Sequence, residues 1–299
     1  MANELSIVIV SFNVKKLLLD CLESIYKNKK DTNNWQIIVV DNASTDGSVE
    51  AVEKKFPKVN LIKSPKNLGY ARGNNLAVSV INSDYVLFLN PDTIIKGDVI
   101  QKTLNFLKEN PKVGAVTCKV LLPDGKLDYS CKRGFPAPWS AFCYFTGLAK
   151  VFPNSKFFAG YTATYLDSDT TNEVECISGT FFMVRRLAAR EVGWWDEDYF
   201  WNGEDIEFCF RLREKGWKIY YYPKGEIVHF KGSSSGLWKS AKVSVSKEVK
   251  LRSAKAGIEA MRIFYEKHYL KNTPFVFRKI VLLGINLLEK VRLLKIKLS

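Results

Sequence analysis

Two acidic residues directly follow apolar segments that are predicted to be buried strands. Asp92 comes after the run Tyr85–Leu89, and Asp41 comes after Trp35–Val40. Proline cannot donate to a sheet ladder, so the first of these strands must stop at Pro91. Ligands of open α/β sheets bind at the carboxyl ends of the strands. We therefore expect both carboxylates at a ligand-binding edge, although each would also suit a turn or a helix cap.

A second acidic group opens a predicted helix, residues 203–216. It consists of Glu204, Asp205 and Glu207, and three aromatic residues precede it at 199–201. The helix dipole favours carboxylates at an N-terminus, so capping accounts for one or two of them. The aromatic residues could wall a pocket in which one of the three carboxylates acts as a general base.

His229 is one of only two histidines, and it follows a short apolar strand. A lone histidine in this position is more often structural. However, the Gly/Ser-rich segment 232–236 comes directly after it and would suit a site that closes on a ligand. The other histidine, His268, lies in a basic helix and receives no role.

Strands and helices alternate in the first half of the chain, which predicts an α/β fold with a mainly parallel sheet and helices on both faces. The expected strands span 5–10, 35–40, 59–62, 85–89 and 113–120, and the expected helices 15–26, 48–55, 71–81 and 99–107. Segment 121–172 is aromatic and rich in Pro and Gly, and we expect a semi-ordered insertion or a lid. Further strands are expected at 174–184, 218–222 and 227–230, and further helices at 203–216, 244–269 and 275–298.

The charge is concentrated in the last part of the chain. The 299 residues carry a formal net charge of +14, of which residues 237–299 contribute +11. This asymmetry suggests a polyanionic partner, either a membrane or a nucleic acid. A nucleic-acid-binding protein would carry interleaved basic and aromatic residues on its body, but the body is nearly neutral. We therefore expect no nucleic acid as a partner.

The cysteines and the first residues indicate the compartment. Six cysteines are scattered without a C-x-x-C pair, which is typical of reduced thiols in a cytosol. No basic and apolar leader precedes the first strand, so no signal peptide is expected. The first turn, residues 11–14, contains no glycine, which argues against a dinucleotide-binding fold.

Four motifs in order resemble glycosyltransferase family 2, with the GT-A fold, and its rhamnosyltransferase-like branch in particular. They are Val39-Val40-Asp41-Asn42-Ala43-Ser44-Thr45-Asp46-Gly47, Asn67-Leu68-Gly69-Tyr70-Ala71-Arg72-Gly73-Asn74-Asn75, Leu89-Asn90-Pro91-Asp92 and Gly203-Glu204-Asp205-Ile206-Glu207. Each motif is weak alone, but the ordered set covers roughly residues 4–270. The resemblance implies a nucleotide-binding half and an acceptor half, predicted to span 1–240, followed by a basic helical extension at 241–299.

The resemblance assigns roles to individual residues. It implies that the donor is bound by Ser11, Asp41, Asn42, Asn67, Gly69, Arg72 and Asn75. It implies that Asp205 is the general base, with Glu204 beside it. Asp92 matches the last carboxylate of the family's Asp-x-Asp metal motif, whereas Asn90 replaces the first. Mg²⁺ or Mn²⁺ is therefore expected on Asp92, with His229 as a second ligand, because such ions also take phosphate oxygens and waters.

The implied reaction is an inverting transfer of a sugar from a nucleotide diphospho-sugar to a hydroxyl of a lipid-linked saccharide, in the synthesis of a surface polysaccharide. L-Rhamnose from dTDP-L-rhamnose is the first expectation, and a UDP-hexose donor is the alternative. The apolar segment 280–288 is too short to span a bilayer, which needs about 20 residues. We expect either a basic amphipathic helix on the cytoplasmic membrane face or a helix packed on the body.

Overall fold

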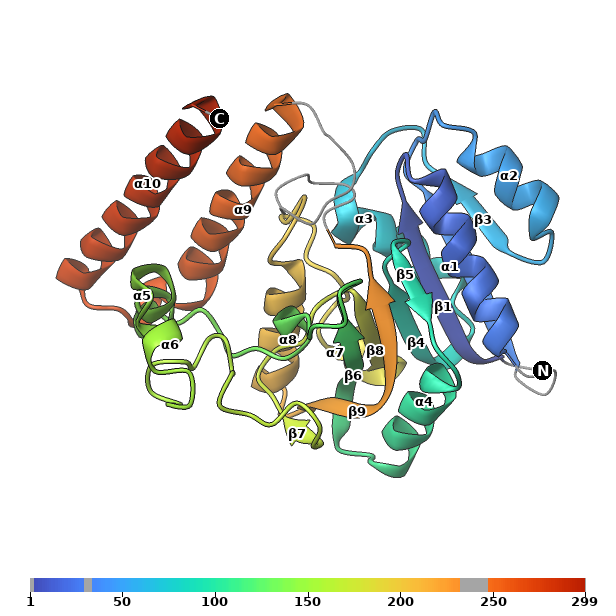
Figure 1. Ribbon diagram of the computed structural model, residues 1–299, viewed down its shortest axis with the longest axis horizontal. Coiled ribbons are helices and arrows are strands. Elements are labelled where there is room, and N and C mark those ends of the chain that lie inside the picture. Colours follow the sequence, from blue (N-terminus) through green and yellow to red (C-terminus); the bar gives the residue numbers. More distant parts are fainter. Residues whose placement is uncertain (1–2, 30–33, 232–246, 299) are drawn as a thin grey trace.

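The first half of the chain forms a parallel sheet with helical crossovers. A computed structural model describes residues 3–29, 34–231 and 247–298. Four parallel strands lie in the order β3-β2-β1-β4 (Figure 1), namely β1 (Asn3–Ser11), β2 (Trp35–Asp41), β3 (Asn60–Lys63) and β4 (Ser83–Leu89). The connecting helices are α1 (Lys15–Asn28), α2 (Ser48–Lys55) and α3 (Gly69–Leu76), with a 3₁₀ turn at Val78–Val80.

The second half extends the same sheet with strands of both directions. The order continues β4-β8-β6-β9-β5, and β7 pairs with β9. These strands are β5 (Thr93–Ile95), β6 (Val113–Leu121), β7 (Asn172–Glu173), β8 (Phe181–Arg185) and β9 (Lys218–His229). β6 and β9 are parallel, whereas β8 is antiparallel to both β4 and β6. The predicted α/β fold with a mainly parallel sheet is confirmed, with antiparallel strands confined to this half.

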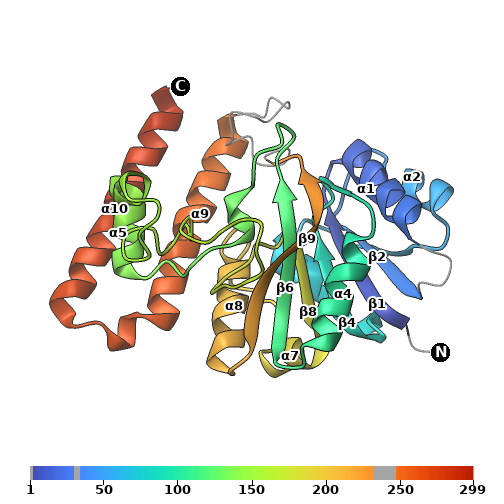
Figure 2. The same cartoon turned by 60° about the horizontal axis from the view of Figure 1, so that its bottom comes forward.

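The buried strands explain why the sheet lies at the centre of the protein. Residues 5–11 of β1 and 86–89 of β4 are all buried, so both faces of these strands are covered. Their continuous apolar character fits strands that lie between two layers of helices. The covering layers include α1, α4 (Val99–Glu109), α7 (Arg186–Glu191) and α8 (Glu204–Glu214) (Figure 2).

The structure corrects three local predictions. Segment 121–172 contains a 3₁₀ turn at Tyr129–Cys131 and two helices, α5 (Pro138–Thr146) and α6 (Leu148–Val151), and so is more regular than expected. The strand expected from residue 174 begins only at Phe181, because the preceding residues form a loop that reaches toward α8. The two strands expected at 218–222 and 227–230 are one strand, β9, with a register shift against β6.

The C-terminal residues form a helical hairpin beside α8. It consists of α9 (Lys247–His268), a 3₁₀ turn at Leu270–Asn272, and α10 (Phe275–Leu298) (Figure 1). Phe264 of α9 packs edge-on against Phe210 of α8, with ring centroids 5.6 Å apart. Ile258, Tyr265 and Ile285 form a small core between α9 and α10. The predicted domain boundary at residue 240 and the start of the expected helix at 244 lie outside the described residues.

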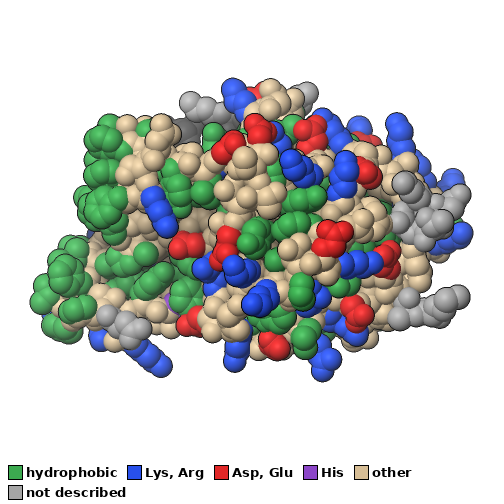
Figure 3. All heavy atoms as spheres, turned by 90° about the horizontal axis from the view of Figure 1, so that it is seen from below, with side chains coloured by type: hydrophobic (Ala, Val, Ile, Leu, Met, Phe, Trp, Pro, Cys, Tyr) green, Lys and Arg blue, Asp and Glu red, His purple; other side chains and the backbone are tan. Residues whose placement is uncertain are grey.

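The surface is uneven in character. Figure 3 shows charged side chains of both signs over most of one face, and hydrophobic side chains gathered at the end formed by α5, α6 and α10. In the described part of the chain, no helix is both long enough and apolar enough to cross a bilayer.

Candidate active site

Two buried oxygen atoms at the carboxyl ends of β1 and β2 have no hydrogen-bond partner among the described residues. Ser11 and Asp41 are paired in register on these strands and are 0% and 3% exposed. One carboxylate oxygen of Asp41 accepts a hydrogen bond from the amide of Ser44 at 2.9 Å. The other oxygen, and the hydroxyl of Ser11, have no hydrogen-bond partner within the described residues. Because unsatisfied buried polar atoms are costly, this pair is suited to receive donor groups of a bound ligand.

The predicted donor loop is tied to the end of β2. The side-chain amide of Asn42 donates to the carbonyl of Gly69 at 2.9 Å and to the side-chain oxygen of Asn67 at 3.2 Å. The side-chain oxygen of Asn42 accepts from the amide of Leu68 at 3.0 Å. The motif residues at 42 and 67–69 therefore form one rigid unit at the edge of the sheet.

Gly69 is required by a close contact between two motifs. It has φ +81°, and a Cβ atom there would lie 2.4 Å from the carbonyl oxygen of Phe200. The same carbonyl accepts from the amide of Tyr70 at 3.1 Å. Only glycine fits such a backbone conformation at this distance. The donor loop is thus held directly against the segment that leads into α8.

Arg72 and Asn75 of α3 contact the loop after α7. The side-chain amide of Asn75 donates to the carbonyl of Trp195 and to a carboxylate oxygen of Glu197, both at 2.9 Å. Arg72 forms an ion pair with the same glutamate at 3.6 Å, and both side chains are about half exposed. These contacts orient α3, and a direct role of either residue in donor binding stays a prediction.

The predicted metal ligands converge at the edge of the sheet. Nε2 of His229, at the end of β9, lies 3.3 Å from a carboxylate oxygen of Asp92, just after β4. Nδ1 of His229 lies 3.1 Å from Asp128, which also accepts a hydrogen bond from Lys231 at 2.7 Å. A carboxylate that holds the far nitrogen of a histidine is the usual support of a metal-binding imidazole.

Contacts with neighbouring charges shift the pKa values of His229 and Asp128. Burial by itself would lower the pKa of His229, but the carboxylates of Asp92 and Asp128 raise it to about 9. Burial would raise the pKa of Asp128, but contacts with His229 and Lys231 bring it well below its usual range. Among the described residues, no three His, Cys, Asp or Glu side chains form a complete metal site. The Asp92–His229 pair therefore fits a divalent cation only if the cation displaces the proton of His229 and if substrate oxygens and waters complete the ligand shell.

Asp205, the predicted base, is held by a buried arginine. Its carboxylate accepts from a guanidinium nitrogen of Arg133 at 2.8 Å and from the amide of Gly179 at 3.2 Å. The side chains of Asp205 and Arg133 are only 13% and 16% exposed. Arg133 comes from the aromatic insertion, outside any motif of the sequence. The arrangement fixes the orientation of Asp205 at the start of α8.

Glu204 differs from Asp205 in having no such partner. One of its carboxylate oxygens is buried without a hydrogen-bond partner in the described chain. Burial, followed by the neighbouring charge of Asp205, raises the pKa of Glu204 to about 8. Burial and the carboxylates of Glu204, Asp205 and Asp92 also raise the pKa of Tyr70 well above its usual value. The hydroxyl of Tyr70 donates to the carbonyl of Gly179 at 2.9 Å, and the amide of the same glycine donates to Asp205, so Gly179 links the donor loop to the start of α8.

The third carboxylate of the helix motif, Glu207, belongs to the scaffold. Both of its oxygens accept hydrogen bonds from Arg211, at 2.5 and 2.6 Å, and it is 1% exposed. His268 of α9 lies 3.5 Å from it and packs on Phe210. This cluster attaches α9 to α8, which is a structural role for the histidine that received none from the sequence.

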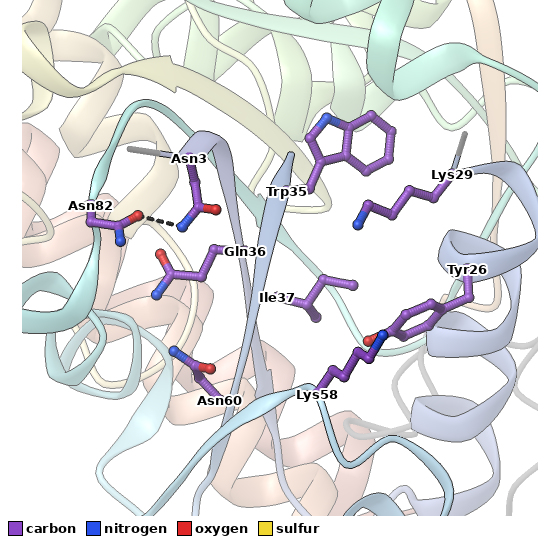
Figure 4. Close-up of a pocket in the computed structure, with 9 residues that line it drawn as sticks. All are labelled: Asn3, Tyr26, Lys29, Trp35, Gln36, Ile37, Lys58, Asn60 and Asn82. Carbon is purple, nitrogen blue, oxygen red and sulfur yellow. Dashed lines mark hydrogen bonds between the residues drawn. The ribbon is translucent and has the colours of Figure 1, made fainter. Parts of the chain in front are cut away.

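One open pocket lined by described residues lies away from these groups. It has a volume of about 320 Å³ and is lined by Asn3, Tyr26, Lys29, Trp35, Gln36, Ile37, Lys58, Asn60 and Asn82 (Figure 4). Asn3, Trp35 and Asn60 of this pocket stand at the amino ends of β1, β2 and β3, whereas Ser11 and Asp41 stand at the carboxyl ends. The pocket is therefore not the place of the predicted chemistry.

Sequence reasoning missed two residues of this site, namely Asp128 and Arg133. Each acts on a predicted residue through a contact between segments that are far apart in the chain, so no local pattern marks it. The Gly/Ser-rich segment 232–236, which was predicted to close on a ligand, lies outside the described residues.

Comparisons with known proteins agree with this geometry. The profile of Glycosyl transferase family 2 matches residues 6–193. The N-acetylglucosaminyl-diphospho-decaprenol L-rhamnosyltransferase of Mycobacterium tuberculosis is 29% identical over 211 residues, covering 67% of this chain and 68% of the relative. The rhamnosyltransferase WbbL of Escherichia coli K12 is 27% identical over 234 residues, covering 75% of this chain and 82% of the relative.

Solved structures show the same fold at lower sequence identity. The mannosyltransferase PcManGT from Pyrobaculum calidifontis, solved with GDP-Man and Mn²⁺, has a TM-score of 0.60 and 16% identity. The match covers 99% of this chain and 74% of that protein. The GT-A fold expected from the sequence is therefore confirmed.

Proposed function

The chain belongs to glycosyl transferase family 2, and from this premise we propose that it transfers L-rhamnose from dTDP-L-rhamnose to a hydroxyl of a lipid-linked saccharide. The observation that carries the site assignment is the convergence of Asp41, Asp92 and Asp205 with their partners at one edge of the sheet. The names of two relatives at 27% and 29% identity support rhamnose as the sugar and a lipid-linked acceptor.

The nucleoside of the donor is proposed to bind at the ends of β1 and β2. The Ser11 and Asp41 oxygens that have no partner in the described chain are both acceptors and are buried, so they suit the N–H of a base or a ribose hydroxyl. The rigid Asn42–Asn67–Gly69 unit forms the adjacent wall. Burial of these groups keeps water away from the hydrogen bonds and strengthens them.

Asp205 is proposed to accept the proton of the acceptor hydroxyl as its oxygen attacks the anomeric carbon. A single displacement without an enzyme nucleophile inverts the configuration of that carbon. Arg133 and the amide of Gly179 hold the carboxylate in place before the acceptor arrives. Glu204, whose pKa is raised to about 8, carries a proton at neutral pH and is a poorer base there.

Asp92 and His229 are proposed to hold Mg²⁺ or Mn²⁺. Such an ion would neutralise the charge that develops on the leaving diphosphate. Asp128 keeps the imidazole oriented, and Lys231 adds a positive charge beside it. The Mn²⁺ in the related mannosyltransferase structure supports the assignment of a divalent cation.

The reaction is proposed to take place at the cytoplasmic face of the membrane, with peripheral contact through the C-terminal helices. All six cysteines are buried and unpaired, as in proteins of reducing compartments. The lipid-linked acceptor would lie in that bilayer.

A donor panel tests the proposal. We would measure release of nucleoside diphosphate from dTDP-L-rhamnose, UDP-N-acetylglucosamine, UDP-glucose and GDP-mannose, each with a polyprenyl-diphospho-N-acetylglucosamine acceptor. Rhamnose transfer with an inverted product is expected. Asp205→Asn should retain donor binding, but its transfer rate should fall by a factor of about 10²–10⁴. Preference for a UDP-hexose would replace the donor assignment, and normal turnover of Asp205→Asn would remove the base assignment.

A further inference from the structure

Helix α10 is apolar on two opposite faces. Val281, Leu282, Ile285 and Leu288 face α9 and belong to the small core of the hairpin. A second set, at positions three or four apart, is exposed: Val276 (65%), Ile280 (58%), Leu283 (69%), Leu287 (62%), Val291 (41%) and Leu294 (57%). Residues with this spacing share one face of a helix. The second face therefore contacts no other described part of the protein to any large extent.

The aromatic insertion exposes a second apolar region. Its side chains stack mainly on one another: the ring of Trp139 lies 5.0 Å from that of Phe157 and 5.7 Å from that of Phe142. The most exposed members are Trp139 (44%), Phe142 (51%), Phe145 (42%), Val151 (67%), Phe152 (45%) and Phe157 (64%). Soluble monomers rarely expose such a contiguous group, and one of this kind marks a contact with another molecule or with lipid.

The two regions are neighbours in space. The guanidinium of Arg292 on α10 lies 5.8 Å from the ring centre of Phe145 on α5. Both views place α5 beside α10, and hydrophobic side chains gather at this end of the molecule (Figures 1, 2 and 3). We call the exposed side chains of α10 and of residues 139–157 together the apolar surface.

Basic residues border the apolar surface. Lys279 and Lys290 are exposed and stand four residues before Leu283 and Leu294, so they flank the exposed face of α10. The sequence of α10 contains Arg278, Lys279, Lys290, Arg292, Lys295 and Lys297 against one acid, Glu289. An apolar face with a basic border matches an anionic lipid surface, where the apolar groups enter the interface and the cations meet the headgroups. A second copy of this chain would bring like charges together.

We propose that the apolar surface docks on an anionic bilayer, with the aromatic insertion and α10 as two halves of one membrane contact. This inference rests on the proposed lipid-linked acceptor, and it adds the insertion to the contact made by the C-terminal helices. The insertion also contains Asp128 and Arg133, which contact His229 and Asp205. The same segment thus joins the membrane contact to the site, and it holds the base at a fixed place relative to an acceptor in the bilayer.

Three double variants test the docking, each replacing two exposed apolar residues by serine. The insertion variant is Phe142→Ser with Phe157→Ser, and the tail variant is Leu283→Ser with Leu287→Ser. The control is Val80→Ser with Leu187→Ser, since these residues are 39% and 56% exposed and lie outside the apolar surface. Circular dichroism and dTDP-L-rhamnose binding would show that each variant is folded.

The measurement is co-sedimentation with vesicles of phosphatidylcholine, with and without phosphatidylglycerol, over a salt series. We expect the wild type and the control to bind the anionic vesicles equally, with weaker binding at high salt. The insertion and tail variants should each bind at least about tenfold more weakly. Brominated lipids should quench tryptophan fluorescence, and Trp139→Phe should remove most of that quenching.

Three outcomes would overturn the inference. One is wild-type binding by the insertion variant, and another is absence of binding by the wild-type protein. The third is a dimer in sedimentation velocity that the insertion and tail variants dissociate, which would make the apolar surface a self-association interface. Vesicle binding is measured without donor or acceptor, so it does not depend on the proposed reaction. If the protein binds vesicles but transfers no rhamnose in the donor panel, only the proposed function is contradicted. If the protein transfers rhamnose to a short soluble acceptor but does not bind anionic vesicles, only this inference is contradicted.

Discussion

Replacement of Arg133 by methionine should reveal how the base is held. The change removes the cation beside Asp205 and keeps the apolar length of the side chain. Both partners are more than four-fifths buried, so the carboxylate would be left without its main counter-charge. Breaking such a buried pair from one side costs about 3–5 kcal/mol. For 299 residues this corresponds to a fall in Tm of roughly 5–8 °C.

The consequence for catalysis follows from the same contact. Because Arg133 is expected to act only through Asp205, Arg133→Met should lower kcat and leave the dissociation constant of dTDP-L-rhamnose unchanged. In the Asp205→Asn background, the same change should have little further effect on kcat. Arg133→Lys should recover part of the stability through its charge, although it lacks the planar fork of the guanidinium.

The assays are thermal unfolding, donor-binding calorimetry and single-turnover transfer, on the two single variants and the double variant. The expected fall in the Tm of Arg133→Met is roughly 5–8 °C. A Tm within about 1 °C of the wild-type value would refute the energetic reasoning. Equal losses of kcat from Arg133→Met in both backgrounds would show that the arginine acts on the substrate independently of Asp205.

Three further predictions concern single side chains. Burial raises the pKa of Glu204 to about 8, so between pH 4.5 and 8 the folded state keeps a proton that the unfolded state loses, and the wild type becomes less stable as pH rises. Glu204→Gln should therefore gain stability relative to the wild type across that range in urea unfolding, and a constant difference would contradict this. Asp92→Ala should weaken nucleoside diphosphate binding chiefly when Mg²⁺ or Mn²⁺ is present, whereas wild-type activity that survives a chelator would exclude the metal. Gly193→Ala should cost only the strain of a left-handed residue, about 1–2 kcal/mol, because a Cβ there meets no described atom within 4 Å. Gly69→Ala should lose more stability, and donor binding as well, because its Cβ would meet Phe200. Equal losses of the two variants would remove the packing explanation.

The sequence by itself determined the alternation of strands and helices and the places where polar residues interrupt them. Asp41 and Asp92 could be placed because a buried strand is a continuous apolar run, and the residue that ends it marks the edge of the sheet. The helix that begins at Glu204 and the break at Pro274 are likewise local properties of the chain. The family could be inferred from four motifs in order, since each motif is formed by neighbouring residues.

Only the tertiary structure decided which side chains support the predicted ones. Arg133 reaches Asp205 from 72 positions away, and Asp128 reaches His229 from 101 positions away. Arg133 and Asp128 both lie in the insertion, whose apolar residues show no regular spacing in the sequence. The reason is that these residues pack on α8, on each other and beside α10, and not on one common face. The two carboxylates at 204 and 205 are adjacent and alike in the sequence. Their environments separate them, because Asp205 is paired with a guanidinium and Glu204 is buried with an oxygen that has no partner in the described chain.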